Sequence, residues 1–252
     1  MCTVSVVPTM RGFRLACNRD EARARARALP PCIRPAGSRR ALWPCDPQSG
    51  GTWIGVNDVG LAMALLNRAP GKVAAPGTPK MSRGVLIPRL LGSSSIARAV
   101  QRVWTQLSVP QKTAAFAPFT LLMVQSHQTA VLEYRARTAS ITRRRLAGPL
   151  LFTSSSLGDE IVDRPRRLLF AAFMKSTHQA LDAQAGFHGH RWPNRPHISV
   201  RMSRADAATV SHTVVDVSDS GITVSYVSDP SQRTPVQSCS LRFSSARSFR
   251  RT

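Results

Sequence analysis

Short runs of β-branched and apolar residues, separated by turns, dominate the hydrophobic pattern. Residues 3–7 and 13–17 are such runs on either side of a turn, so they predict an N-terminal β-hairpin. Residues 51–57 and 61–66 predict another hairpin around the turn Asn57-Asp58-Val59-Gly60. Further strands are expected at 119–125, 129–134, 150–153, 209–217 and 221–227.

Helical periodicity is expected in three stretches, residues 85–91, 96–107 and 159–183. Residues 29–50, which are rich in Pro, Gly and Arg, are expected to form a long surface loop. Hairpins and helices do not alternate one for one, which disfavours a doubly wound parallel sheet. We therefore predict an α+β fold in which two antiparallel sheets have helices on their outer faces.

The length of 252 residues is enough for one large domain or two small ones. We expect a single domain over residues 1–237, followed by a flexible Ser/Arg-rich tail at 238–252. No window is apolar for the ~18 residues that a transmembrane helix needs. The start lacks the basic and long apolar regions of a secretory signal, so a cytoplasmic protein is predicted. Five cysteines, an odd number without a Cys-x-x-Cys pair, argue against a disulfide framework and a zinc ribbon.

The formal charge of +22 comes from 35 basic and 13 acidic residues, and nearly all the basic residues are arginine. Arginines are scattered along the chain, residues 22–28 alternate Ala and Arg, and no interleaved aromatic signature is present, which argues against nucleic acid as a partner. A solvated arginine-rich surface is the simplest interpretation, and attraction of carboxylate or phosphate ligands is the alternative. The loop with His188, His190 and His197 is interpreted as solvated or ligand-lining, so no metal site is predicted.

Cys2 is the first candidate for chemistry, because removal of Met1 would place a thiol and a free α-amine on one residue. An α-amine with a pKa of ~8 can act as a base, and an ionised thiol is a nucleophile. Without other support, Cys2 would be a small residue that begins a strand.

Two further segments support Cys2. The hairpin returns residues 17–21 beside it, where the carboxylate of Asp20 could orient the amine and Arg19 could favour the thiolate. Asn67 ends an apolar strand, where its amide could donate a hydrogen bond to an oxyanion. The alternatives are a solvated charged turn and an Asn that caps a strand end.

Three motifs in this order resemble the NRDE family, also called the transport and Golgi organisation protein 2 family. They are Met1-Cys2-Thr3, Cys17-Asn18-Arg19-Asp20-Glu21 and Gly50-Gly51-Thr52-Trp53-Ile54-Gly55-Val56-Asn57. Residues 150–157, Leu-Leu-Phe-Thr-Ser-Ser-Ser-Leu, are similar to the Thr-Asn-Ser-Ser-Leu segment of that family. The resemblance covers most of the chain and is strongest over residues 1–68.

This family in turn looks like the N-terminal nucleophile (Ntn) hydrolases of the bile-salt hydrolase and penicillin V acylase branch. The resemblance implies a four-layer αββα sandwich, with Cys2 as the nucleophile and Asp20 near its amine. It also implies that Asn67 is the oxyanion asparagine and that Arg19 lies beside the position of a catalytic arginine.

Further residues are expected to contact the substrate. Ser154 stands where the acylases have an asparagine, and their late arginine corresponds to Arg201 or Arg204. The full set of expected substrate contacts is Asn18, Trp53, Asn57, Ser154 and Arg204.

The predicted function is that of a cysteine Ntn amidohydrolase that acts on a linear amide or acyl substrate without a cofactor. The alternative is a non-catalytic carrier of haem or another hydrophobic acid on the same scaffold, since the resemblance also implies roles in haem trafficking and lipid-linked metabolism. Weak polyanion binding is a third hypothesis, motivated by the arginine excess.

Overall fold

Two antiparallel sheets form the centre of the computed structural model, which describes residues 2–68, 81–107, 116–135, 138–176 and 179–244. The first has six strands in the order β10-β1-β2-β11-β12-β13, and the second has seven in sequence order from β3 to β9. The strands are β1 Cys2–Thr9, β2 Gly12–Ala22, β3 Leu29–Ala36, β4 Arg39–Cys45, β5 Ile54–Asn57, β6 Ala62–Asn67, β7 Phe119–Gln125, β8 Gln128–Arg135, β9 Thr138–Arg145, β10 Leu150–Thr153, β11 Ala207–Ser218, β12 Gly221–Val227 and β13 Gln237–Leu241.

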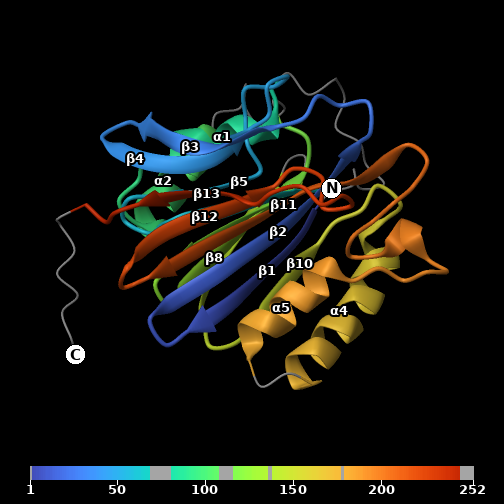
Figure 1. Ribbon diagram of the computed structural model, residues 1–252. Helices are drawn as coiled ribbons and strands as arrows, with labels where there is room; N and C mark the ends of the chain where they lie inside the picture. Colours follow the sequence, from blue (N-terminus) through green and yellow to red (C-terminus); the bar gives the residue numbers. More distant parts are fainter. Residues whose placement is uncertain (1, 69–80, 108–115, 136–137, 177–178, 245–252) are drawn as a thin grey trace.

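Helices cover the outer face of each sheet, which gives four layers (Figure 1). The described part of the chain contains four helices, α1 Leu86–Leu90, α2 Ile96–Leu107, α4 Asp159–Ser176 and α5 Ala180–Gly189. The first two pack on the seven-stranded sheet, and the other two pack on the six-stranded sheet. A third apolar cluster, with Val4, Leu15, Ile54 and Leu66 among its members, fills the space between the sheets. The α+β sandwich predicted from the strand order is therefore confirmed.

The expected loop at 29–50 is wrong over most of its length, because the hairpin of β3 and β4 occupies this stretch. Three prolines, at 30, 31 and 35, obscured the strand pattern. Proline is tolerated here because β3 is the edge strand of its sheet and needs hydrogen bonds on one side only. Leu42 and Trp43 of β4 are buried and anchor the hairpin.

Two other predicted boundaries also change. The single helix expected over 159–183 is two helices, α4 and α5, and its last predicted residues belong to α5. The tail was expected from residue 238, but residues 237–241 form β13, which pairs with β12. Leu241 of this strand is buried in the core between the sheets. The remainder of that tail, 245–252, lies outside the described residues, and the single-domain boundary stays a prediction. None of the described helices combines the length and apolar character that crossing a membrane requires.

Candidate active site

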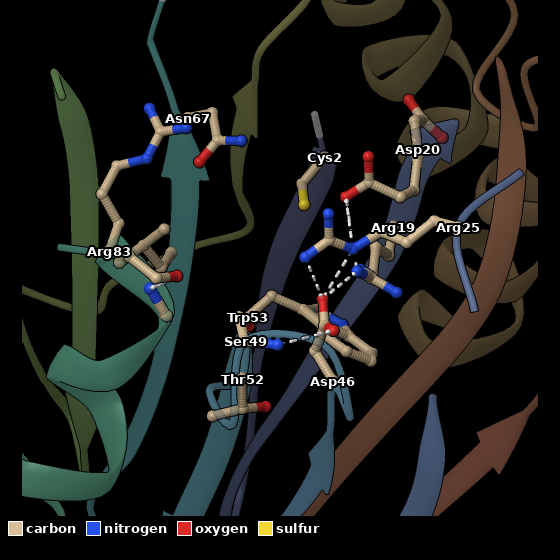
Figure 2. Close-up of a pocket in the computed structure, with 14 residues that line it drawn as sticks. Cys2, Arg19, Asp20, Arg25, Asp46, Ser49, Thr52, Trp53, Asn67 and Arg83 are labelled. Carbon is tan, nitrogen blue, oxygen red and sulfur yellow. Dashed lines mark hydrogen bonds and ion pairs between the residues drawn. The ribbon is translucent and has the colours of Figure 1, made fainter. Parts of the chain in front are cut away.

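Cys2 is the first residue of β1 and lines a cavity of about 250 Å³ at the end of the two sheets. The residue is buried, with 4% of its surface exposed. In Figure 2, Cys2 lies between Asn67 and Arg83 on one side and Asp20 on the other. The described residues that line this cavity are Cys2, Arg19, Asp20, Glu21, Arg25, Asp46, Ser49, Thr52, Trp53, Leu65, Asn67, Ser82, Arg83 and Gly84.

The predicted N-terminal hairpin sets the position of Arg19, because the antiparallel register pairs it directly with Cys2. The Arg19 guanidinium lies 2.8 Å from Oδ2 of Asp46 and stacks 4.4 Å from the centre of the Trp53 ring. The side chains of Arg19 and Asp46 are each 7% exposed, so this is a buried ion pair. Burial alone would raise the pKa of Asp46, but the hydrogen bond from Arg25 and the charge of Arg19 outweigh it and lower that pKa.

A second cysteine, Cys17, contributes most to lowering the pKa of Cys2. Cys17 lies on β2 and pairs with Val4 of β1, two residues along the strand from Cys2 and on the same face of the sheet. Both cysteines are buried in the core between the sheets. The Cys17 thiol donates a hydrogen bond that lowers the pKa of Cys2, although burial opposes the shift. Burial raises the pKa of Cys17 well above its usual value, so Cys17 keeps its proton and remains a donor.

Asp20 follows Arg19 on β2 and is buried with 1% of its surface exposed. The Thr209 hydroxyl of β11 donates to its Oδ1 at 2.6 Å. Burial raises the pKa of Asp20, and the buried Arg166 guanidinium of α4 and the Thr209 hydrogen bond act against that rise. The hydrogen bond from Thr209 thus fixes the Asp20 carboxylate at the cavity wall.

Asn67 and Arg83 reach the cavity from the second sheet and its following segment. Asn67 is the last residue of β6, opposite Phe119 of β7. Arg83 belongs to a 3-10 turn, Arg83–Val85, and its Nη1 donates to the Pro118 carbonyl at 2.8 Å. Burial lowers the pKa of Arg83, and the nearby sulfur of Cys2 acts in the opposite direction.

A close backbone contact explains how the Gly-Gly-Thr-Trp motif positions Arg83. A Cβ atom on Gly51 would lie 2.6 Å from the carbonyl carbon of Gly84, which side chains do not tolerate. The amide of Thr52 donates to the Gly84 carbonyl at 3.0 Å and completes the contact. Gly51 therefore lets the turn that carries Arg83 lie against the strand start that carries Trp53.

Two expected substrate contacts point elsewhere. Asn18 is buried on the helix side of its sheet, where Nδ2 donates to the carbonyls of His188 and Val200 at 2.9 and 3.0 Å. Asn57 donates to the Leu91 carbonyl at 2.7 Å, and its Oδ1 accepts the amides at the turn closed by Gly60, where φ is +68°. Both asparagines hold the fold together, and neither is among the described residues that line the cavity.

Ser154 and Arg204 are also absent from the described cavity lining. Ser154 lies behind Cys2, and its Oγ accepts a hydrogen bond from the Cys2 amide nitrogen at 3.0 Å. The Ser154 amide in turn donates to the Cys2 carbonyl at 3.0 Å. Arg204 donates to the Ser156 hydroxyl at 3.3 Å and lies 3.9 Å from Asp206. Ser154 thus contacts the nitrogen of Cys2 rather than the space in front of its sulfur.

The sequence did not single out Asp46, Arg25 or Arg83. Asp46 was hidden in the predicted loop, where its pairing with Arg19 across the two sheets has no local signal. Arg83 follows a proline-rich stretch, and long-range contacts through Gly84 and to the Pro118 carbonyl bring it to the cavity.

Comparisons with solved structures find the same fold. Penicillin V acylase from Agrobacterium tumefaciens is 12% identical, with a TM-score of 0.52 over 96% of this chain and 86% of that chain. The N-acylethanolamine-hydrolyzing acid amidase orthologue of Caenorhabditis elegans is 13% identical, with a TM-score of 0.58 over 84% of this chain and 92% of that chain. The C2A mutant of conjugated bile acid hydrolase from Clostridium perfringens is 12% identical, with a TM-score of 0.51 over 96% of this chain and 92% of that chain. These are Ntn-hydrolase sandwiches, and at such low identities the likeness concerns the fold.

The family itself follows from the sequence. A comparison with curated proteins finds no match. The sequence model of the Transport and Golgi organisation 2 family matches residues 1–180, well over half of the chain. The chain therefore belongs to the Transport and Golgi organisation 2 family.

Proposed function

We propose that this protein is a cysteine N-terminal nucleophile amidohydrolase that acts on a small amide or acyl substrate. The observation that carries the proposal is one cavity lined by Cys2, Arg19, Asp20 and Asn67 together. The lowered pKa of Cys2 supports it, because the thiolate is the nucleophilic form of cysteine. The structural neighbours include an acylase and an amidase, which agrees with this reaction class.

The amine of Cys2 would act as the base after removal of Met1. The Cys2 nitrogen already lies 3.0 Å from Oγ of Ser154, so this hydroxyl would hold the free amine. Asp20, which lines the same cavity as Cys2, would accept a hydrogen bond from the ammonium form of the Cys2 amine. Ser154 therefore takes a positioning role in this proposal, at the place where the acylases have an asparagine.

Cleavage would proceed in two steps. The Cys2 thiol gives its proton to the amine, and the sulfur attacks the amide carbon, whose oxygen becomes negatively charged. The Asn67 amide would donate to that oxyanion, with the Arg83 charge on the same side of Cys2 (Figure 2). The amine then passes the proton to the leaving nitrogen, which breaks the C–N bond. Water gives a proton to the free amine and attacks the resulting thioester; the C–S bond breaks, the acid leaves, and the amine returns the proton to the sulfur.

Intact-protein mass spectrometry and alkylation test the first requirement of this mechanism. We expect the purified protein to lack Met1, and Cys2 to react with iodoacetamide at pH 6. Cys32 is an exposed thiol in the same chain and provides an internal comparison. Retention of Met1, or alkylation of Cys32 while Cys2 stays unmodified, contradicts the proposal.

Hydrolysis of a panel of N-acyl amides tests the second requirement. Cys2→Ala should abolish turnover, and Asn67→Ala should lower kcat about 100-fold or more, as loss of one oxyanion donor does. Asn194→Ala removes an exposed asparagine far along the chain and should leave kcat unchanged. Equal losses in the two asparagine variants would exclude Asn67 from the reaction.

The carrier alternative remains a second proposal, since arginines such as Arg83 and Arg25 at the cavity could meet the carboxylates of haem or another hydrophobic acid. Titration with haemin tests it, because a carrier requires a saturable spectral shift at micromolar ligand. Absence of that shift removes haem as the carried ligand. A cytoplasmic location stays a prediction.

A further inference from the structure

A second cavity of about 220 Å³ adjoins the Cys2 cavity. The two share Arg19, Glu21 and Arg25 in their linings, so these side chains lie between them. Figure 2 shows Arg25 beside Arg19 and Asp46 at this boundary. The second cavity is also lined by Arg23 and Arg27, and by β12 and the segment that follows it.

The alternating Ala-Arg segment at 22–28 supplies most of the charge in this second cavity. Among its described lining residues, four arginines face two carboxylates, those of Glu21 and Asp229, which leaves an excess of two positive charges. The backbone fixes the start of the segment, because the Arg23 amide donates to the Asp206 carbonyl at 3.0 Å. Three arginines of this segment, Arg23, Arg25 and Arg27, therefore line one cavity.

The three arginines differ in how far their charge is neutralised. Arg25 pairs with Asp46 at 2.8 Å, and Arg27 lies 4.0 Å from Asp229 at an exposed position. Arg23 donates only to uncharged oxygens, the Arg204 carbonyl and the Ser203 hydroxyl, each at 2.9 Å. No ion pair found among the described residues includes Arg23. Its guanidinium is thus held in place, and its charge remains available to an anion.

Tyr226 adds a neutral donor to the same lining. Its side chain is 1% exposed, and burial raises the pKa of Tyr226. The phenol therefore keeps its proton at neutral pH and can donate to an oxygen. A guanidinium fork together with a hydroxyl suits a carboxylate, sulfonate or phosphate group.

We propose that the second cavity binds an anionic group of the substrate, a carboxylate, sulfonate or phosphate, while the scissile amide lies at Cys2. This inference rests on the proposed amidohydrolase function, and it narrows the substrate to amides that carry a negative charge. Arg23 provides the charge that discriminates an anionic substrate from its neutral analogue. Arg19 and Arg25 border both cavities, so the substrate would pass along these two side chains between the anion and Cys2.

Equilibrium binding to the Cys2→Ala variant tests the proposal without requiring turnover. The probes are 6-(decanoylamino)hexanoic acid and 6-(decanoylamino)hexanamide, which differ only in a terminal carboxylate or neutral amide and carry it five methylene groups from the scissile amide nitrogen. Isothermal titration calorimetry at constant ionic strength should show at least about tenfold tighter binding of the acid, a difference typical of one charge-assisted pair. Inorganic phosphate should compete with the acid and leave binding of the amide unchanged.

Arg23→Gln in the same background should reduce the preference for the acid to less than about threefold. Arg98→Gln is the matched control, since it removes an exposed arginine of α2 that is outside both described cavity linings. Equal affinity for the two probes, absence of binding by both, or an equal effect of the two arginine variants overturns the proposal. Failure of the amidohydrolase function would appear separately, as an unreactive Cys2 or as absent turnover in the parent protein.

Discussion

Acidification should destabilise the fold through His212 of β11. Its Nδ1 lies 2.7 Å from Oδ1 of Asn18, and its ring centre is 5.1 Å from that of His188. Because the Asn18 amide nitrogen already donates to two carbonyls, its Oδ1 is the acceptor and His212 donates through Nδ1–H. Burial lowers the pKa of His212 to about 4, and the charge of Arg14 acts in the same direction.

The sign of the pH effect follows from the two states. A histidine in the unfolded chain titrates near pH ~6.5, so below that pH the unfolded state binds a proton that the folded state excludes. Stability is complete above pH ~6.5 and falls as the pH decreases toward the folded pKa of about 4. The interval spans about 2.5 pH units at ~1.4 kcal/mol each, and solvent around the partly exposed ring keeps the loss at or below about 3 kcal/mol. Such a loss is a large part of the ~5–15 kcal/mol that stabilises a typical domain.

Urea unfolding at pH 7, 5.5 and 4.5 measures this loss. His212→Asn retains a donor near the Nδ1 position and does not titrate, so it should lose up to about 3 kcal/mol less than the parent over this range. His127→Asn removes an exposed histidine and should keep the slope of the parent. Identical slopes for the parent and His212→Asn would refute the argument.

Three further substitutions probe the site and its support. Cys17→Ala removes the hydrogen bond to the Cys2 sulfur, so the midpoint of Cys2 alkylation against pH should move to higher pH; an unmoved midpoint contradicts this. Arg166→Met leaves Thr3 Oγ1 and two buried carbonyls without their donor and should cost at least about 3 kcal/mol in urea unfolding, whereas the exposed Arg167→Met should cost less than ~1 kcal/mol. Gly51→Ala forces the turn that carries Arg83 away and should lower the free energy of unfolding by about 1–3 kcal/mol, whereas Gly148→Ala, with open space around it, should leave it unchanged. Equal losses for the two arginine variants would contradict the role of the Arg166 hydrogen bonds, and equal losses for the two glycine variants would contradict the role of the Gly51 contact.

Local sequence patterns were sufficient to predict most of the fold and the central residues of the candidate site. Runs of β-branched and apolar residues around a turn predicted the first hairpin, and its length alone brought Arg19 beside Cys2, as the observed register shows. Strand ends also placed Asn67 at the cavity. These features depend on residues close in sequence or on one hairpin, so periodicity and turn chemistry are sufficient to find them.

Features that depend on contact between distant segments were not predictable. The proline-containing strand β3 is stable because it lies at a sheet edge, which no local pattern reveals. Asn18 and Asn57 have the residue types of ligand-binding groups, but their neighbours turn both into internal hydrogen-bonding residues. Asp46 reaches the cavity through its ion pair with Arg19, 27 positions away, and Arg83 is held there by the Pro118 carbonyl, 35 positions away.

From the sequence, Arg19 alone was expected to favour the thiolate form of Cys2, but in the structure a second residue contributes to this. Cys17, on the same hairpin as Cys2, contributes most to lowering the pKa of Cys2, and the charge of Arg19 contributes less. Arg19 is held by Asp46, which follows a strand of the other sheet, and its guanidinium covers Trp53. Because breaking a buried ion pair exposes an unpaired charge to a low dielectric, Arg19 and Asp46 tie the two sheets together at the cavity. The pKa of Cys2 is therefore lowered mainly within one hairpin, while the shape of the cavity in front of its sulfur depends on the contact between the sheets.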